Sequence, residues 1–82
     1  MLLPITSPET LGKVLRNYRK ELGLSQSEAG KKFNLPQKTV SRIESGVSTI
    51  QVGTVFKYMS ALTLEMNLAP RQKHSKDDEV LW

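Results

Sequence analysis

The stretch LSQSEAGKKFNLPQKTVSRIESG, residues 24–46, decides the fold because it specifies two short helices and the turn between them. Ser25 and Glu28 form a capping box, a pattern that starts a helix by satisfying two backbone N–H groups. Asn34 tolerates the left-handed backbone conformation that ends a helix. A second helix is then expected over residues 37–44. The stretch therefore predicts a helix-turn-helix unit.

Apolar residues on both sides of this stretch also recur at helical spacing. Ser7 and Pro8 indicate a helix over residues 8–22, because serine caps a helix and proline suits its first position, and Gly23 ends it. A further helix is expected over residues 52–62. The side chains expected in the core are Leu11, Val14, Leu15, Tyr18, Leu22, Ala29, Phe33, Val40, Ile43, Val55, Phe56, Met59 and Leu62.

The helix expected over residues 37–44 has two unlike faces. Its outer face carries four polar or basic side chains that can form hydrogen bonds, namely Gln37, Lys38, Ser41 and Arg42. In the major groove of DNA, glutamine pairs well with adenine, while arginine and lysine pair with guanine. Gln26 opens the preceding helix, where an amide and backbone N–H groups can hold a phosphate. The pattern therefore predicts a face that reads double-stranded DNA.

Residues 63–68 change from a helical period to alternation of polar and apolar side chains, which is typical of a half-buried strand. A single strand cannot satisfy its backbone hydrogen bonds, and the chain offers no second one. We therefore expect it to pair with the same strand of a second copy, through Leu64, Met66 and Leu68. Residues 1–69 then form a DNA-binding and dimerisation domain, and residues 70–82 a flexible tail.

Composition fits one small domain with a nucleic-acid partner. The 82 residues carry a formal net charge of +4, all of it within residues 1–69. Cysteine is absent and His74 is the single histidine, so no disulfide, metal site, cofactor site or catalytic set can be assembled. We expect no enzyme activity and no small-molecule substrate. The lack of a signal peptide or long apolar run favours a cytoplasmic protein away from membranes.

Residues 24–46 resemble the helix-turn-helix of the Xre/Cro phage-repressor family, in the Leu-Ser-Gln opening and the Ser-Arg-Ile-Glu-x-Gly close. The resemblance implies a mainly helical, lambda-repressor-like bundle of four to five helices that represses transcription. It implies that Gln26 contacts phosphate and that Glu44 pairs with Arg19. It also implies base contacts by Gln37, Lys38, Ser41 and Arg42, with Thr39 at the DNA backbone or a thymine methyl. Three positions depart from the family pattern: Gly30, Asn34 and Pro36.

A narrower resemblance links residues 62–68, with residues 54–57 before them and Trp82 at the end of the chain, to the HipB-type antitoxins. That family implies dimerisation through paired strands, repression of the protein's own operon and binding of a HipA-type kinase toxin. Trp82 is then the expected anchor of the tail on the kinase, because tryptophan buries a large rigid surface. The alternative is that Trp82 folds back on its own domain.

Other interpretations of the chain remain open at this point. A plain repressor without a protein partner would carry a dispensable tail. An RNA-binding adaptor would show exposed aromatic side chains, whereas the few aromatics here are expected in the core. Four basic residues outside the reading face are expected to be solvated charges, namely Lys13, Arg16, Lys31 and Lys32.

Overall fold

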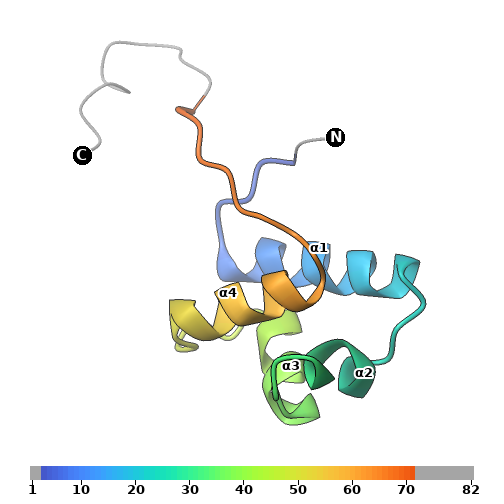
Figure 1. The fold of residues 1–82 in the computed structure, drawn as a ribbon. Coiled ribbons are helices and arrows are strands. Elements are labelled where there is room, and N and C mark those ends of the chain that lie inside the picture. Colours follow the sequence, from blue (N-terminus) through green and yellow to red (C-terminus); the bar gives the residue numbers. More distant parts are fainter. Residues whose placement is uncertain (1–2, 72–82) are drawn as a thin grey trace.

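In the computed structural model, residues 3–71 are described, and they contain four helices (Figure 1). The helices are α1 (Pro8–Glu21), α2 (Gln26–Lys31), α3 (Gln37–Glu44) and α4 (Val52–Ala61). Helix α3 packs against both α1 and α2, and α2 also packs against α4. The expected mainly helical fold is confirmed. No helix within the described range is long and apolar enough to span a membrane.

The helix boundaries follow the capping residues. Ser7 Oγ accepts a hydrogen bond from the backbone N–H of Thr10 at 3.1 Å, and Pro8 is the first residue of α1. Ser25 and Glu28 make both bonds of the capping box, at 2.8 and 3.1 Å. Asn34 has a φ of 58°, so the turn between α2 and α3 uses the left-handed conformation expected there.

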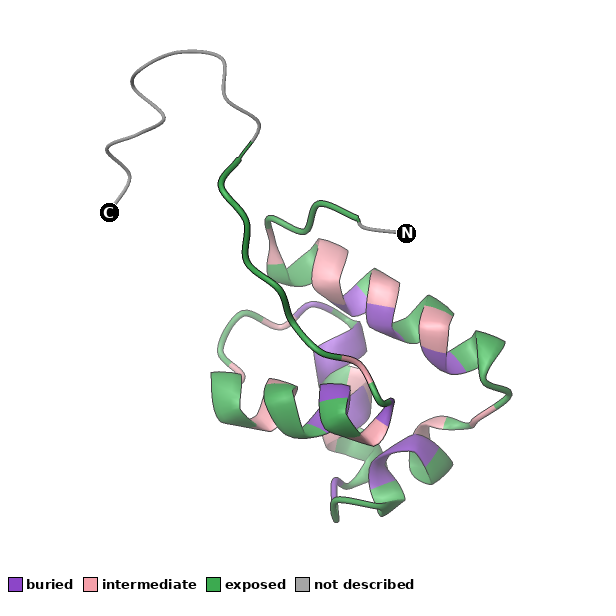
Figure 2. Cartoon of the chain, turned by 45° about the horizontal axis from the view of Figure 1, so that its top comes forward, coloured by how far each residue is buried: buried purple, intermediate pink, exposed green. Residues whose placement is uncertain are grey.

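The core lies where the four helices face one another (Figure 2). Its buried apolar side chains are Leu15, Ala29, Leu35, Val40, Ile43, Tyr58, Met59 and Leu62. Helix α2 packs closely against α3 because Gly30 has no side chain. A Cβ there would lie 2.5 Å from the carbonyl oxygen of Leu35 in the turn and 3.0 Å from Val40 Cγ2 of α3.

Three residues expected in the core are exposed instead. Phe33 is 38% exposed because α2 ends at Lys31, so the helical spacing that points Phe33 inward does not reach it. Leu22, which follows the last residue of α1, is 45% exposed.

Phe56, the third of these residues, is 46% exposed. It follows Val55 by one residue and so lies about 100° around α4 from the inward face. Tyr58 fills the core at that level of the helix and is fully buried. The sequence prediction did not include Tyr58, although it lies three residues from Val55 and four from Leu62.

The chain leaves α4 through Thr63, which has a φ of 59°. The backbone N–H of Leu64 then donates to the carbonyl of Met59 at 2.8 Å. Beyond this point residues 65–71 form neither helix nor strand, and they leave the bundle on the same side as residues 3–7 (Figure 1). The strand expected here requires a second copy, so its pairing stays a prediction. Trp82 and residues 72–82 of the expected tail lie outside the described residues.

Candidate nucleic-acid interface

The outer face of α3 presents the side chains that the sequence assigned to base reading. Gln37, Lys38 and Arg42 are exposed, and Ser41 is half-buried. Val40 and Ile43 are buried on the opposite side, as the helical period requires. Thr39 is half-buried beside the exposed set. The structure therefore brings the four predicted base-reading residues together on one face of one helix.

The amino end of α3 lies where the sequence predicted it, although its first turn has no side-chain cap. Pro36 is the residue before the helix and makes no side-chain capping bond. Its carbonyl accepts from the backbone N–H groups of Thr39 and Val40, at 2.9 and 3.1 Å. The missing cap oxygen therefore does not shift the start of the helix. Gln37 occupies the first helical position.

Gln37 and Gln26 form a direct hydrogen bond between the two helices of the motif. Gln37 Nε2 donates to Gln26 Oε1 at 2.7 Å. Gln26 in turn donates from Nε2 to Glu44 Oε1 at 3.1 Å. Sequence reasoning assigned Gln26 and Gln37 to separate contacts, and it missed that they touch.

Glu44 is the centre of a buried polar cluster behind this pair. Arg19 donates from Nε to Glu44 Oε2 at 2.7 Å and from Nη2 to Oε1 at 2.9 Å. The pairing of Arg19 with Glu44 that the phage-repressor resemblance implied is confirmed. The hydroxyl of Tyr58 also donates to Glu44 Oε2. The hydroxyl explains why a tyrosine, rather than a phenylalanine, fills the core at this level of α4.

The pKa values in this cluster reflect its charge pairing. Burial acts to raise the pKa of Glu44, but hydrogen bonds from Arg19, Tyr58 and Gln26 outweigh it and hold the pKa below its usual value. Burial raises the pKa of Tyr58, and the hydrogen bond to the Glu44 carboxylate raises it further. The carboxylate is therefore ionised and the phenol protonated at neutral pH.

A polar hollow borders the α3 face on the side of α1. Lys13 and Arg16 of α1 line it together with Ser41 and Gln26, and both basic side chains are exposed. Lys31 and Lys32 are exposed as well. The expectation of solvated charges fits all four basic residues. The positive charge of Lys13 and Arg16 nevertheless lies beside the predicted DNA-reading face.

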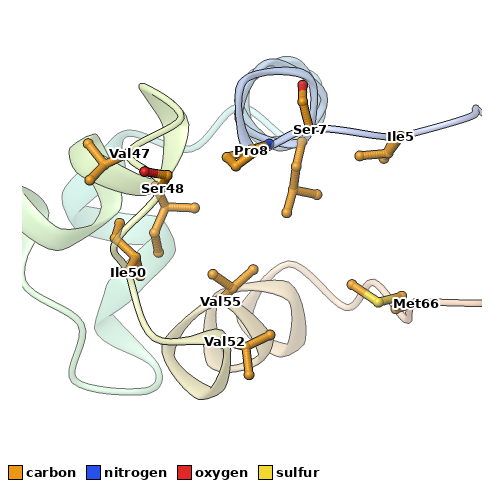
Figure 3. A pocket seen from close by; sticks show the side chains of 11 residues that line it. Ile5, Ser7, Pro8, Val47, Ser48, Ile50, Val52, Val55 and Met66 are labelled. Atoms are coloured by element: carbon orange, nitrogen blue, oxygen red, sulfur yellow. The ribbon is translucent and has the colours of Figure 1, made fainter. Parts of the chain in front are cut away.

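A second, apolar groove of about 300 Å³ lies elsewhere on the molecule (Figure 3). It is formed by the segment before α1, the loop after α3, helix α4 and Met66, with Ile5 and Val52 on its wall. Of the three residues predicted at a dimer interface, Met66 borders this groove. Leu64 packs partly buried against the core and Leu68 is 91% exposed.

Fold and site together define a helix-turn-helix protein. The helix-turn-helix family matches residues 15–67 of the chain. Antitoxin HipB of Escherichia coli, from strain K12 and from O6:H1 (strain CFT073), is 32% identical over 73 residues. These residues make up 89% of this chain and 83% or 78% of the respective relative.

Solved structures agree with these relatives. A HipA–HipB–O2–O3 complex contains a chain that matches with a TM-score of 0.82 and 31% identity, covering 87% of this chain and all of the other. A HipB–O4 20mer complex gives the same TM-score, identity and coverage. The chain therefore belongs to the helix-turn-helix family and, within it, to the family of HipB antitoxins.

Proposed function

We propose that this protein is a sequence-specific transcriptional repressor and the antitoxin of a HipA-type kinase, and that it represses its own operon. The observation that carries the proposal is the outer face of α3, where Gln37, Lys38, Ser41 and Arg42 share one side of a helix. A major groove admits one α-helix, and these four side chains offer the donors and acceptors that base edges require.

The remaining parts of the domain support contacts with the DNA backbone. Gln26 is half-buried and accepts a hydrogen bond from Gln37, and an N–H of its amide is proposed to reach a phosphate. Thr39 lies on α3 beside the four base-reading residues, where it would contact the DNA backbone or a thymine methyl. The net charge of +4 adds a general attraction for DNA. The protein acts by binding rather than by catalysis, and its DNA partner implies a cytoplasmic location.

The dimer is part of the same proposal. Residues 63–69 pair with those of a second copy, and Leu64, Met66 and Leu68 supply the apolar contacts. Leu68 is 91% exposed in the single chain, so burying it against a partner removes apolar surface from water. Two α3 helices related by a two-fold axis would then enter successive major grooves about 34 Å apart, on a palindromic operator.

The proposal of a kinase partner is supported by the relatives of this protein. HipB is found with HipA in one of the matched complexes. In this proposal residues 1–69 supply the DNA-binding and dimerisation domain, and residues 70–82 supply the segment whose Trp82 anchors on the kinase.

The test is a pull-down from the native host with the tagged full chain and with a variant that lacks residues 70–82. We expect mass spectrometry to identify a HipA-type kinase with the full chain and not with the shortened one. Recovery by both forms would move the kinase contact to the folded domain. If neither form recovers a kinase while both retain promoter DNA, the protein is a plain repressor and the antitoxin proposal is wrong.

A further inference from the structure

We propose that buried Glu44 sets which base Gln37 reads, because it fixes the direction in which the amides of Gln26 and Gln37 point. These three residues are called the amide relay below. The inference rests on the function proposed above, since it concerns how the outer face of α3 reads DNA. It adds a positioning residue that does not itself reach the DNA.

The relay starts from the chemistry of a carboxylate. Glu44 is 6% exposed, and its oxygens accept two hydrogen bonds from Arg19, one from Tyr58 and one from Gln26. An ionised carboxylate only accepts hydrogen bonds. Gln26 must therefore turn its NH2 group, not its carbonyl, toward Glu44. Burial of Glu44 keeps water from taking over this role.

In the second step, the orientation of the Gln26 amide fixes the orientation of the Gln37 amide. With its NH2 group on Glu44, Gln26 presents its carbonyl oxygen to the outside, where Gln37 Nε2 donates to it at 2.7 Å. If either amide turned over alone, two carbonyl oxygens or two NH2 groups would face each other. The ionised carboxylate thus selects one orientation for both glutamines.

The third step concerns what Gln37 still offers. One N–H of its amide is used by Gln26, so one N–H and the carbonyl oxygen remain. Adenine presents one acceptor, N7, and one donor, the N6 amino group, in the major groove. Guanine presents two acceptors, O6 and N7, and would require two donors. The relay therefore matches Gln37 to adenine and disfavours guanine.

Glu44→Gln removes the carboxylate that fixes the orientation of Gln26, with little change in the size of the side chain. The new amide can donate to Gln26, which lets both Gln26 and Gln37 turn over, and Gln37 then presents two N–H donors. The experiment selects binding sites from a random 30-base-pair duplex library with the unaltered protein and with this variant. The base pair that Gln37 reads is identified as the one whose preference disappears in Gln37→Ala.

We expect the unaltered protein to select adenine at that position. Glu44→Gln should reduce the preference for adenine over guanine about tenfold, which is the size of one bidentate base contact. Preferences that depend on Arg42 should stay unchanged. Selection of another base by the unaltered protein, or an unchanged adenine preference in folded Glu44→Gln, would overturn the relay.

Two control variants separate positioning from stability. Tyr58→Phe and Arg19→Lys weaken the cluster but retain the carboxylate beside Gln26, so both should keep the adenine preference. Loss of the preference in either control would mean that stability alone governs it, and the proposal would be wrong.

A further variant covers the case in which Glu44→Gln does not fold. Gln26→Met removes the middle of the relay and leaves the Arg19 pair in place, and it should lose the same preference. Retention of the adenine preference by Gln26→Met would contradict the relay. If the unaltered protein enriches no sequence at all, the proposed DNA-binding function itself fails, and the relay fails with it.

Discussion

Arg19 and Glu44 lie 25 residues apart in the sequence, yet Arg19 donates to both carboxylate oxygens of Glu44, at 2.7 and 2.9 Å. Both residues are buried, at 7% and 6% exposure. The pair joins the last turn of α1 to the last residue of α3. It therefore fixes how the helix that carries the proposed DNA-reading face is held against the rest of the domain.

Removal of one partner from this ion pair should strongly destabilise the fold. Arg19→Met leaves the Glu44 carboxylate buried without its opposite charge, and we expect it to lower the free energy of unfolding by about 3–5 kcal/mol. Arg16→Met is the matched control, because Arg16 is exposed on the same helix and should change stability by about 0.5 kcal/mol at most. Urea unfolding followed by circular dichroism measures both. Equal effects would contradict the account of the pair.

Replacement of Gly30 and of Gly53 by alanine should change the stability of the fold in opposite directions. A Cβ on Gly30 would lie 2.5 Å from the carbonyl oxygen of Leu35 and 3.0 Å from Val40 Cγ2, so Gly30→Ala should lower stability by about 1–3 kcal/mol. At Gly53 a Cβ meets no described atom within 4 Å, and Gly53→Ala should raise stability by up to about 1 kcal/mol. Thermal unfolding measures the stability of both variants. A Gly30→Ala variant as stable as the unaltered protein would contradict the close approach of α2 and α3.

The Glu44 cluster should make stability fall in acid. The pKa of Glu44 is lower in the folded protein than its ordinary value of 4.5, so the unfolded chain binds a proton first as the pH falls. The contribution of Glu44 is complete above pH 4.5 and is lost as the pH drops through the folded-state pKa. Urea unfolding between pH 6 and pH 3 should show this loss. Glu44→Gln should be less stable at pH 6 and depend less steeply on pH, and an equal slope would refute the assignment.

The proposed strand pair predicts that Met66 is needed for the dimer. Met66→Lys places a charge in the apolar contact between two copies and should yield monomers in sedimentation velocity runs at concentrations where the unaltered protein is dimeric. Asn67→Lys is the control, because alternation along a strand points Asn67 away from that contact. A dimeric Met66→Lys would rule out pairing through residues 63–69.

The parts of the fold that depend on local chemistry could be predicted from the sequence. Ser7 and Ser25 act on backbone groups within a few residues, so the helix starts they determine agree with the structure. Asn34 adopts the left-handed conformation expected of it, but α2 already ends at Lys31. The inward and outward faces of α3 followed from its period alone. Phe33 shows the limit of this reasoning, because a helical period holds only where the helix continues.

The contacts that join distant residues could not be predicted from spacing. The bond between Gln26 and Glu44 spans 18 residues and depends on how α2 and α3 pack. Tyr58 reaches Glu44 from a third helix. Its spacing from Val55 and Leu62 is consistent with the inward face of α4, but spacing does not show that its hydroxyl meets Glu44. The Arg19 pair was anticipated only through the resemblance to phage repressors.

The central claim is that the outer face of α3 recognises a specific DNA sequence. Its most direct test is a fluorescence anisotropy titration of a labelled duplex from the promoter upstream of the protein's own gene, against a scrambled duplex of equal length and at fixed salt. We predict a preference for the promoter of about 1,000-fold or more. Arg42→Ala should weaken promoter binding by about 1–3 kcal/mol and relax specificity at one base pair. Equal affinity of the unaltered protein for both duplexes would contradict the claim.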